Sequence, residues 1–155
     1  MQSIAIAGIQ MHLSAIQPNI QRMRQRLDVT MDQCPWIEMV VFSELAAFGP
    51  LISHAQPLPG PAEEQFCEMA AKHKIWLIPG SLYEKTDGVV YNTASVINPK
   101  GEVIGRYRKM FPFMPYEEGV EAGNEFLVFD IPDRGRFGVS ICYDSWMPET
   151  SRTMA

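Results

Sequence analysis

Three reactive side chains stand where strands are expected to end, namely Glu44, Lys109 and Cys142. Glu44 follows the apolar run 40–42, and Cys142 follows the apolar segment 137–141. A thiol, a carboxylate and an ammonium supply the nucleophile, the proton acceptor and the oxyanion stabiliser that acyl transfer requires, without a metal. An ammonium at Lys109 is also expected to favour the thiolate form of a nearby cysteine.

Each of these residues also has a plainer interpretation. Cys142 is a candidate for a small buried hydrophobe, because free cysteines are commonly buried. Glu44 fits a helix cap or a surface acid, and Lys109 fits a solvated lysine at a strand end. Glu117 and Glu118 are adjacent carboxylates, whose plainer interpretation is a solvated acidic loop. Position alone leaves both kinds of interpretation open.

The elements that must position these side chains alternate between strand and helix in the first half of the chain. Apolar residues at steps of three and four predict a helix over 18–34, and Pro61 is typical of the first turn of a second helix. Alternating strands and helices indicate an α/β fold, and the hairpins make its sheet mixed, with helices on one face. Apolar runs bounded by turn residues predict strands over 3–11, 38–42, 75–83, 89–97, 102–108, 125–131 and 136–142.

Length, charge and cysteine usage limit the class of protein. The 155 residues fit a single domain over 1–155. The net charge is −5 and no basic stripe is present, which argues against a nucleic-acid partner. The apolar runs fall far short of the ~20 residues of a membrane-spanning helix, so no membrane partner is expected. Three cysteines without paired spacing favour a reducing, cytoplasmic location over a disulfide framework.

Signatures of metal and nucleotide sites are absent from the sequence. His12, His54 and His73 are scattered singly, without an HxH or HExxH arrangement. The sequence contains neither a GxGxxG nor a Walker motif. We therefore expect neither a metal nor a cofactor.

Three motifs follow one another in a fixed order. They are Val-Val-Phe-Ser-Glu over 40–44, Gly-Arg-Tyr-Arg-Lys over 105–109, and Gly-Val-Ser-Ile-Cys-Tyr-Asp-Ser-Trp-Met-Pro-Glu over 138–149, with shorter matches over 8–10, 91–94 and 98–101. In this combination the chain resembles the nitrilase, or carbon–nitrogen hydrolase, superfamily along essentially its whole length. A motif is confirmed by the sequence and structural context around it. The resemblance therefore favours the catalytic interpretations of Glu44, Lys109 and Cys142.

The resemblance implies hydrolysis of a small amide or N-carbamoyl compound through a cysteine thioester, with release of ammonia or an amine. It makes Cys142 the nucleophile and Glu44 the general base. It assigns stabilisation of the tetrahedral intermediate to Lys109, together with the backbone N–H of Tyr143. Two alternatives stay open: a nitrilase acting on a nitrile, and an inactive nitrilase-like interaction module.

Many members of the superfamily carry a second glutamate between the lysine and the cysteine, which orients the substrate or assists the base. The segment 109–117 looks most like the corresponding loop of the aliphatic amidase and formamidase branch, so Glu117 is preferred to Glu118 for this role. Tyr143, Phe113 and Trp146 are expected to bind the substrate, and the rings of Phe113 and Trp146 to line the pocket for its acyl group. Core packing is the alternative for the last two rings.

The chain is short for this superfamily, whose members are typically about twice as long and fold as an α-β-β-α sandwich. We therefore expect half of such a sandwich, cut off soon after the nucleophile motif, with one face of the sheet uncovered. An exposed apolar face favours association. The expected partners are a second copy of the chain or the missing C-terminal half, besides the small amide substrate.

Overall fold

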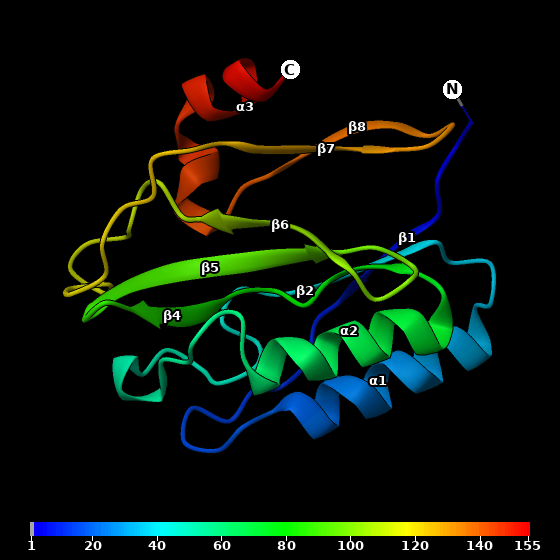
Figure 1. The fold of residues 1–155 in the computed structure, drawn as a ribbon, viewed down its shortest axis with the longest axis horizontal. Coiled ribbons are helices and arrows are strands. Elements are labelled where there is room, and N and C mark those ends of the chain that lie inside the picture. Colours follow the sequence, from blue (N-terminus) through cyan, green and yellow to red (C-terminus); the bar gives the residue numbers. More distant parts are fainter. Residues whose placement is uncertain (1) are drawn as a thin grey trace.

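The computed structural model describes residues 2–155 and consists of a six-stranded sheet, two helices on one of its faces and a β-hairpin on the other (Figure 1). The strands are β1 (Ile6–Ile9), β2 (Met39–Phe42), β3 (Trp76–Ile78), β4 (Leu82–Thr86), β5 (Val89–Ile97), β6 (Val103–Arg108), β7 (Leu127–Ile131) and β8 (Gly135–Val139). The helices are α1 (Ile20–Gln33), α2 (Pro61–His73) and α3 (Pro148–Met154), with short 3-10 helices η1 (Ile52–His54) and η2 (Cys142–Trp146).

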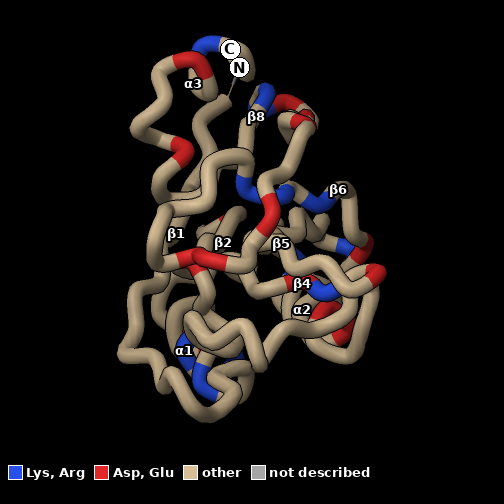
Figure 2. The backbone as a smooth tube through the Cα atoms, turned by 90° about the vertical axis from the view of Figure 1, so that its left-hand side faces the viewer, with Lys and Arg blue, Asp and Glu red and all other residues tan. Residues whose placement is uncertain are grey.

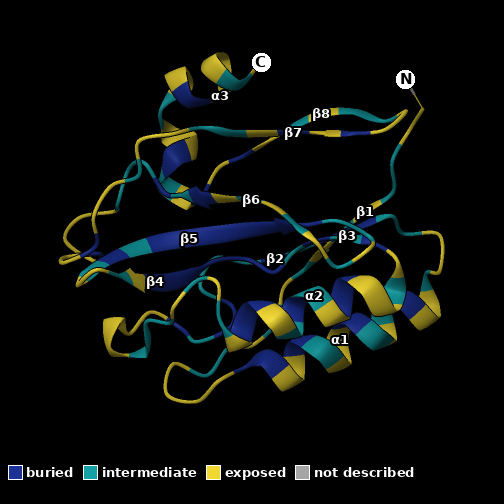
Figure 3. Cartoon of the chain, in the orientation of Figure 1, coloured by how far each residue is buried: buried dark blue, intermediate teal, exposed yellow. Residues whose placement is uncertain are grey.

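The sheet is mixed, which confirms the prediction. β1, β2 and β3 pair in parallel, as expected for strands joined through helices α1 and α2. β5 is antiparallel to β3 and also pairs antiparallel with β4 and β6. β5 is therefore the centre of the sheet, and it is buried along most of its length (Figure 3).

The two long helices form where the apolar periodicity predicted them. In α1, Met23 and Leu27 are fully buried against the sheet. α2 begins at Pro61, whose missing N–H costs nothing at a first helical position, and it buries Phe66 and Met69. These side chains belong to one continuous core between the helices and the sheet.

The prediction of a single strand over 75–83 is wrong. The chain instead forms β3 and β4, separated by Pro79, Gly80 and Ser81. Gly80 has φ +76°, a left-handed conformation that ends the extended run and that glycine adopts at little cost. The apolar pattern continues through the break, and so periodicity alone did not reveal it.

The expectation of an uncovered sheet face is wrong where the β7–β8 hairpin lies, whereas Ile6 of the edge strand β1 stays 50% exposed. β7 and β8 pair only with each other and form a separate two-stranded sheet over the face opposite α1 and α2 (Figure 1). Phe129, Ile131 and Val139 of this hairpin pack in one core cluster with Val96 and Tyr107 of the large sheet. The hairpin therefore supplies a second apolar layer.

Charged residues of both signs are interspersed over the molecule (Figure 2). Ion pairs join elements that are distant in sequence, such as Arg106 of β6 with Glu63 of α2. Within residues 2–155, no helix is long and apolar enough to cross a membrane.

Candidate active site

Glu44 lies just beyond the end of β2, in a turn that the neighbouring loop holds in place. Leu45 has φ +54°, and its backbone N–H donates to the hydroxyl oxygen of Ser81 at 3.0 Å. Next to Ser81, Gly80 approaches so closely that a Cβ there would lie 1.9 Å from the carbonyl oxygen of Ser43. The loop after β3 therefore fixes the backbone on both sides of the Glu44 side chain.

Lys109 lies just beyond the end of β6, opposite Asn92 of β5. The register of the two strands pairs Thr93 with Arg108, and the Lys109 N–H donates to the Asn92 carbonyl at 2.8 Å. The Lys109 side chain is only 1% exposed. Its plainer interpretation as a solvated surface lysine is therefore wrong.

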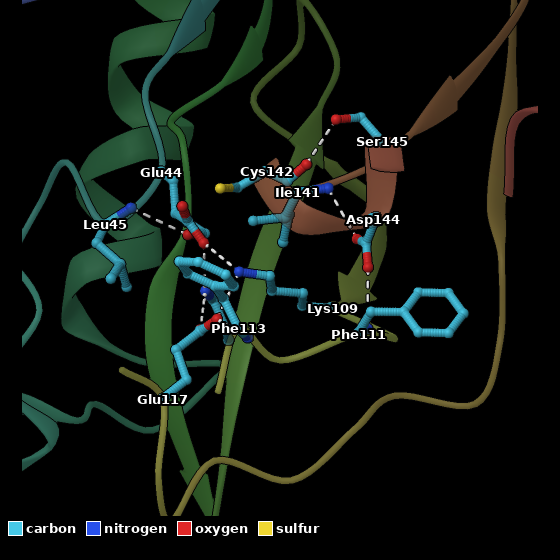
Figure 4. Close-up of polar contacts among 12 residues, drawn as sticks. Glu44, Leu45, Lys109, Phe111, Phe113, Glu117, Ile141, Cys142, Asp144 and Ser145 are labelled. Carbon is cyan, nitrogen blue, oxygen red and sulfur yellow. Dashed lines mark hydrogen bonds and ion pairs between the residues drawn. The ribbon is translucent and has the colours of Figure 1, made fainter. Parts of the chain in front are cut away.

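Lys109, Asn92 and two glutamates form a closed ring of hydrogen bonds (Figure 4). Lys109 Nζ donates to Glu44 Oε1 at 2.8 Å and to Glu117 Oε2 at 2.5 Å. Asn92 Nδ2 donates to Glu44 Oε1 and to Glu117 Oε1, each at 2.8 Å. Both carboxylates are thus held by the same cation and the same amide.

The ring perturbs the acid–base properties of its members. Burial by itself lowers the pKa of Lys109, but the hydrogen bonds and charges of Glu117 and Glu44 outweigh burial and leave this pKa raised. Burial likewise favours a raised pKa for Glu117, but the hydrogen bonds from Lys109, the Phe113 N–H and Asn92 outweigh it and leave this pKa lowered. Lys109 is therefore held as a cation and Glu117 as an anion.

Glu117 and Glu118 occupy different environments. Both oxygens of Glu117 accept hydrogen bonds, and Oε2 takes a second one from the Phe113 N–H at 2.7 Å. Glu118 is exposed and lies outside the ring. The geometry suits Glu117 for orienting its neighbours, because its lone pairs are already engaged.

Cys142 is the first residue of η2, three residues beyond the end of β8, and it is exposed. Its φ of +45° is rare for a residue with a side chain, and its sulfur points towards Glu44 (Figure 4). Its interpretation as a buried hydrophobe is therefore wrong. A nucleophile presented from a sharp turn after a strand is open to an incoming substrate.

Lys109 lowers the pKa of Cys142, in the direction that was expected, but other effects outweigh it in the resting site. Partial burial and then the negative charge of Glu44 raise the pKa of Cys142, and the opposing effect of Lys109 is smaller. Lys109 is shared between two carboxylates, which explains why its charge does not dominate at the sulfur. Cys142 is therefore held as a neutral thiol beside a carboxylate.

A small cavity of about 100 Å³ lies beside Cys142 and Glu44. Its walls are mostly apolar and come from the ends of β2, β3 and β8, the loops after them and the middle of β5: Val41, Phe42, Glu44, Ile78, Gly80, Ser81, Ala94, Val139, Ser140, Ile141 and Cys142. The reactive thiol and carboxylate are thus set at one side of a largely apolar chamber.

Phe113, Tyr143 and Trp146 were expected to bind the substrate, the first and last of them through its acyl group, but none of them lines this cavity. They form a row in which Phe113 and Trp146 are exposed and Tyr143 between them is half-buried. The ring centroids of Phe113 and Tyr143 are 4.9 Å apart, and those of Tyr143 and Trp146 are 5.9 Å apart. Trp146 is 77% exposed, so core packing does not account for it. Contact with a substrate larger than the cavity stays a prediction for this row.

Sequence reasoning missed the roles of two polar residues. Asn92 stands in the motif 91–94 and Asp144 in the motif 138–149, but nothing in those patterns revealed what either side chain touches. The Asn92 Oδ1 has no partner within residues 2–155, because its Nδ2 faces the glutamates.

Within residues 2–155, no three His, Cys, Asp or Glu side chains are grouped as metal ligands.

Comparison with known proteins gives consistent matches. The sequence model of the family described as "Carbon-nitrogen hydrolase" matches residues 3–155. A formamidase of Bacillus cereus (strain B4264) is 30% identical over 147 residues. Among solved structures, Saccharomyces cerevisiae Nit3, a nitrilase-superfamily protein, superposes with a TM-score of 0.84 at 27% identity. A carbon–nitrogen hydrolase from Helicobacter pylori G27 also superposes with a TM-score of 0.84 at 27% identity.

These matches cover nearly all of this chain but only part of each relative. The alignment with the formamidase spans 90% of this chain and 44% of the formamidase. The superpositions span 98% of this chain and 61% of Nit3, and 97% of this chain and 55% of the Helicobacter protein. The chain therefore spans less than half the length of the curated relatives that it matches.

Proposed function

Because this chain belongs to the carbon–nitrogen hydrolase family, we propose that it hydrolyses the carbon–nitrogen bond of a small amide or N-carbamoyl compound through a thioester on Cys142. The observation that carries the proposal is the convergence of a thiol, a carboxylate and a buried ammonium from three separate segments. The small, largely apolar cavity beside them favours a short acyl group.

The first step is attack of the Cys142 sulfur on the amide carbonyl carbon, while the thiol proton passes to Glu44. Oε1 of Glu44 already accepts hydrogen bonds from Lys109 and Asn92, which leaves Oε2 to take this proton. The raised pKa of Cys142 suits this step, because the thiol stays neutral until its proton moves to the neighbouring base.

Charge then develops on the carbonyl oxygen and needs donors. Lys109 has three N–H groups, of which Glu44 and Glu117 engage two, so a third remains for the oxyanion. The backbone N–H of Tyr143 follows the nucleophile and is the second proposed donor. Glu117 and Asn92 act by holding the ammonium and the base in place.

The intermediate collapses by breaking the carbon–nitrogen bond, and the leaving nitrogen takes the proton that Glu44 received. Water then attacks the thioester carbonyl and gives one proton to Glu44. Breaking the carbon–sulfur bond releases the carboxylic acid, and the proton on Glu44 returns to the sulfur. Glu44 thus serves both halves of the reaction, and no external oxidant or cofactor is consumed.

The test is ammonia release from formamide, acetamide, propionamide and butyramide by the full chain, with the acyl-enzyme trapped by acid quench and intact mass. We expect the shorter amides to be favoured and the adduct to map to Cys142. Cys142→Ala should reduce turnover by at least about 10³-fold, because the nucleophile is lost. Cys34→Ala, at a cysteine remote from the ring, is the matched control.

Turnover that survives Cys142→Ala would contradict the proposal, as would an acyl adduct on Cys34 or Cys67. Activity confined to nitriles would replace the amide substrate by a nitrile and leave the assignment of the nucleophile intact. Complete inactivity towards both classes, with a folded chain, would favour a non-catalytic role.

A further inference from the structure

Asp144 is a buried carboxylate at the junction of the nucleophile turn and the lysine loop. It is 0% exposed, and within residues 2–155 no lysine or arginine pairs with it. An anion without a cation is costly to bury unless donors surround it. Three donors do so, and their identities indicate what the carboxylate is for.

One oxygen of Asp144 closes the turn that presents Cys142. Oδ2 accepts the Ile141 N–H at 2.9 Å (Figure 4). The Asp144 N–H donates back to the Ile141 carbonyl at 3.1 Å. This reciprocal pair encloses Cys142 and Tyr143. It therefore stabilises the left-handed conformation of Cys142, which an unsupported chain would avoid.

The same carboxylate reaches the segment that carries Lys109. Oδ1 accepts the Phe111 N–H at 2.9 Å, two residues after Lys109. Oδ2 also accepts the hydroxyl hydrogen of Tyr107 at 2.7 Å, two residues before Lys109. Tyr107 is itself fully buried, so this contact is sheltered from water. The backbone on each side of Lys109 is thus tied to one side chain of the nucleophile turn.

We propose that Asp144 is a positioning residue that sets the placement of Cys142 relative to Lys109. The two groups lie on segments that are not neighbours in sequence, and Asp144 hydrogen-bonds directly to both segments. The proposal rests on the proposed roles of Cys142 and Lys109. Its test measures thiol reactivity rather than amide turnover, so failure of the proposed function would be seen separately.

Asparagine is the informative replacement because it keeps the shape and removes the charge. The carboxylate accepts backbone N–H groups at both oxygens, whereas an amide has only one acceptor oxygen. In either orientation, the amide NH₂ of Asp144→Asn faces a backbone N–H. One of the two links is therefore lost, either to Ile141 or to Phe111.

The experiment measures the rate of Cys142 alkylation by iodoacetamide against pH, by peptide mapping, with and without Lys109→Gln. In the otherwise unchanged chain, Lys109→Gln should slow alkylation near neutral pH by about threefold, because the ammonium that favours the thiolate is lost. In the Asp144→Asn background, the same substitution should change the rate by much less. The coupling between the two groups would then have been lost.

Two control variants distinguish a positioning role of Asp144 from a general effect on the stability of the fold. Tyr107→Phe removes one donor to Asp144 and keeps both backbone links, so it should lower the unfolding temperature while retaining the threefold effect of Lys109→Gln. Asp130→Asn makes the same chemical change at an exposed position of the β7–β8 hairpin, where Asp130 pairs with Arg136, and should leave the effect unaltered.

An undiminished effect of Lys109→Gln in folded Asp144→Asn would overturn the proposal. If Asp144→Asn does not fold, amide hydrogen exchange in the unsubstituted chain decides. The N–H groups of Ile141 and Phe111 should both be protected, because Asp144 accepts both hydrogens. Exchange of either N–H at the rate of an unprotected amide would contradict the link.

Discussion

At the scale of single residues, the pairing of Cys142 with Glu44 leads to a specific prediction. Burial and then the Glu44 charge raise the pKa of Cys142, so removing that charge should lower this pKa. Glu44→Gln should therefore speed alkylation of Cys142 by iodoacetamide near neutral pH by several-fold, because more thiolate is present. The same substitution should abolish amide turnover, because the proton acceptor is lost.

Glu118→Gln is the matched control, since Glu118 is an exposed glutamate outside the ring. It should alter neither rate appreciably. Slower alkylation in Glu44→Gln would show that Glu44 promotes ionisation of the resting thiol. The neutral-thiol description of the site would then be incorrect.

At the scale of elements, the loop between β3 and β4 is predicted to support the turn after β2. Gly80→Ala would bring a Cβ to 1.9 Å from the Ser43 carbonyl oxygen at φ +76°. Gly88→Ala, in the β4–β5 hairpin, has a similar φ of +82° but no heavy atom within 4 Å of the added Cβ. Both substitutions should cost about 1–2 kcal/mol for the left-handed backbone.

The difference in free energy of unfolding between Gly80→Ala and Gly88→Ala measures the contact of the added Cβ with the Ser43 carbonyl oxygen. Gly80→Ala should lower the free energy of unfolding in urea by about 1–3 kcal/mol more than Gly88→Ala, as overpacking commonly does. It should also slow amide turnover, since the backbone next to Glu44 must move. Equal stability losses and unchanged turnover would show that the loop does not hold Glu44.

At the scale of the whole molecule, buried ion pairs predict how stability depends on acid. Burial favours a raised pKa for Glu84, but hydrogen bonds from Arg108 and Thr93 outweigh it, and the pKa lies below its ordinary value of 4.5. The pKa of Glu117 is lowered in the same way. A carboxylate whose folded pKa is lowered stabilises the fold above about pH 4.5, and this contribution is lost as pH falls through the folded value.

The urea midpoint should therefore be nearly constant from pH 7 to about pH 5 and decrease steeply below about pH 4.5. Glu84→Gln should lower the urea midpoint at neutral pH. It should also make the fall of the midpoint below about pH 4.5 shallower, because glutamine does not titrate and the lowered pKa of Glu84 is lost. The urea midpoint of Glu118→Gln should depend on pH in the same way as that of the unsubstituted chain. If the urea midpoint of Glu84→Gln falls below about pH 4.5 as steeply as that of the unsubstituted chain, Glu84 is excluded as a source of the acid sensitivity.

The sequence by itself determined the kinds and order of most elements and the identities of the reactive side chains. Apolar periodicity placed α1, and Pro61 marked the start of α2. The Asp-Gly pair at 87–88 is typical of a hairpin turn and joins β4 to β5. These signals are local, because periodicity and turn conformation depend on neighbours in the chain. The same locality hid the break at Gly80, where the apolar pattern continues although the strand is interrupted by a left-handed residue.

Only the tertiary structure decided which side chains meet and with what charge. Lys109 and Glu44 are 65 positions apart, and the amide of Asn92 bridges two glutamates that lie on different loops. The raised pKa of Cys142 depends on burial and on the nearby Glu44 charge. Sheet register, burial and distance set these properties, and they exist only once the segments have packed together.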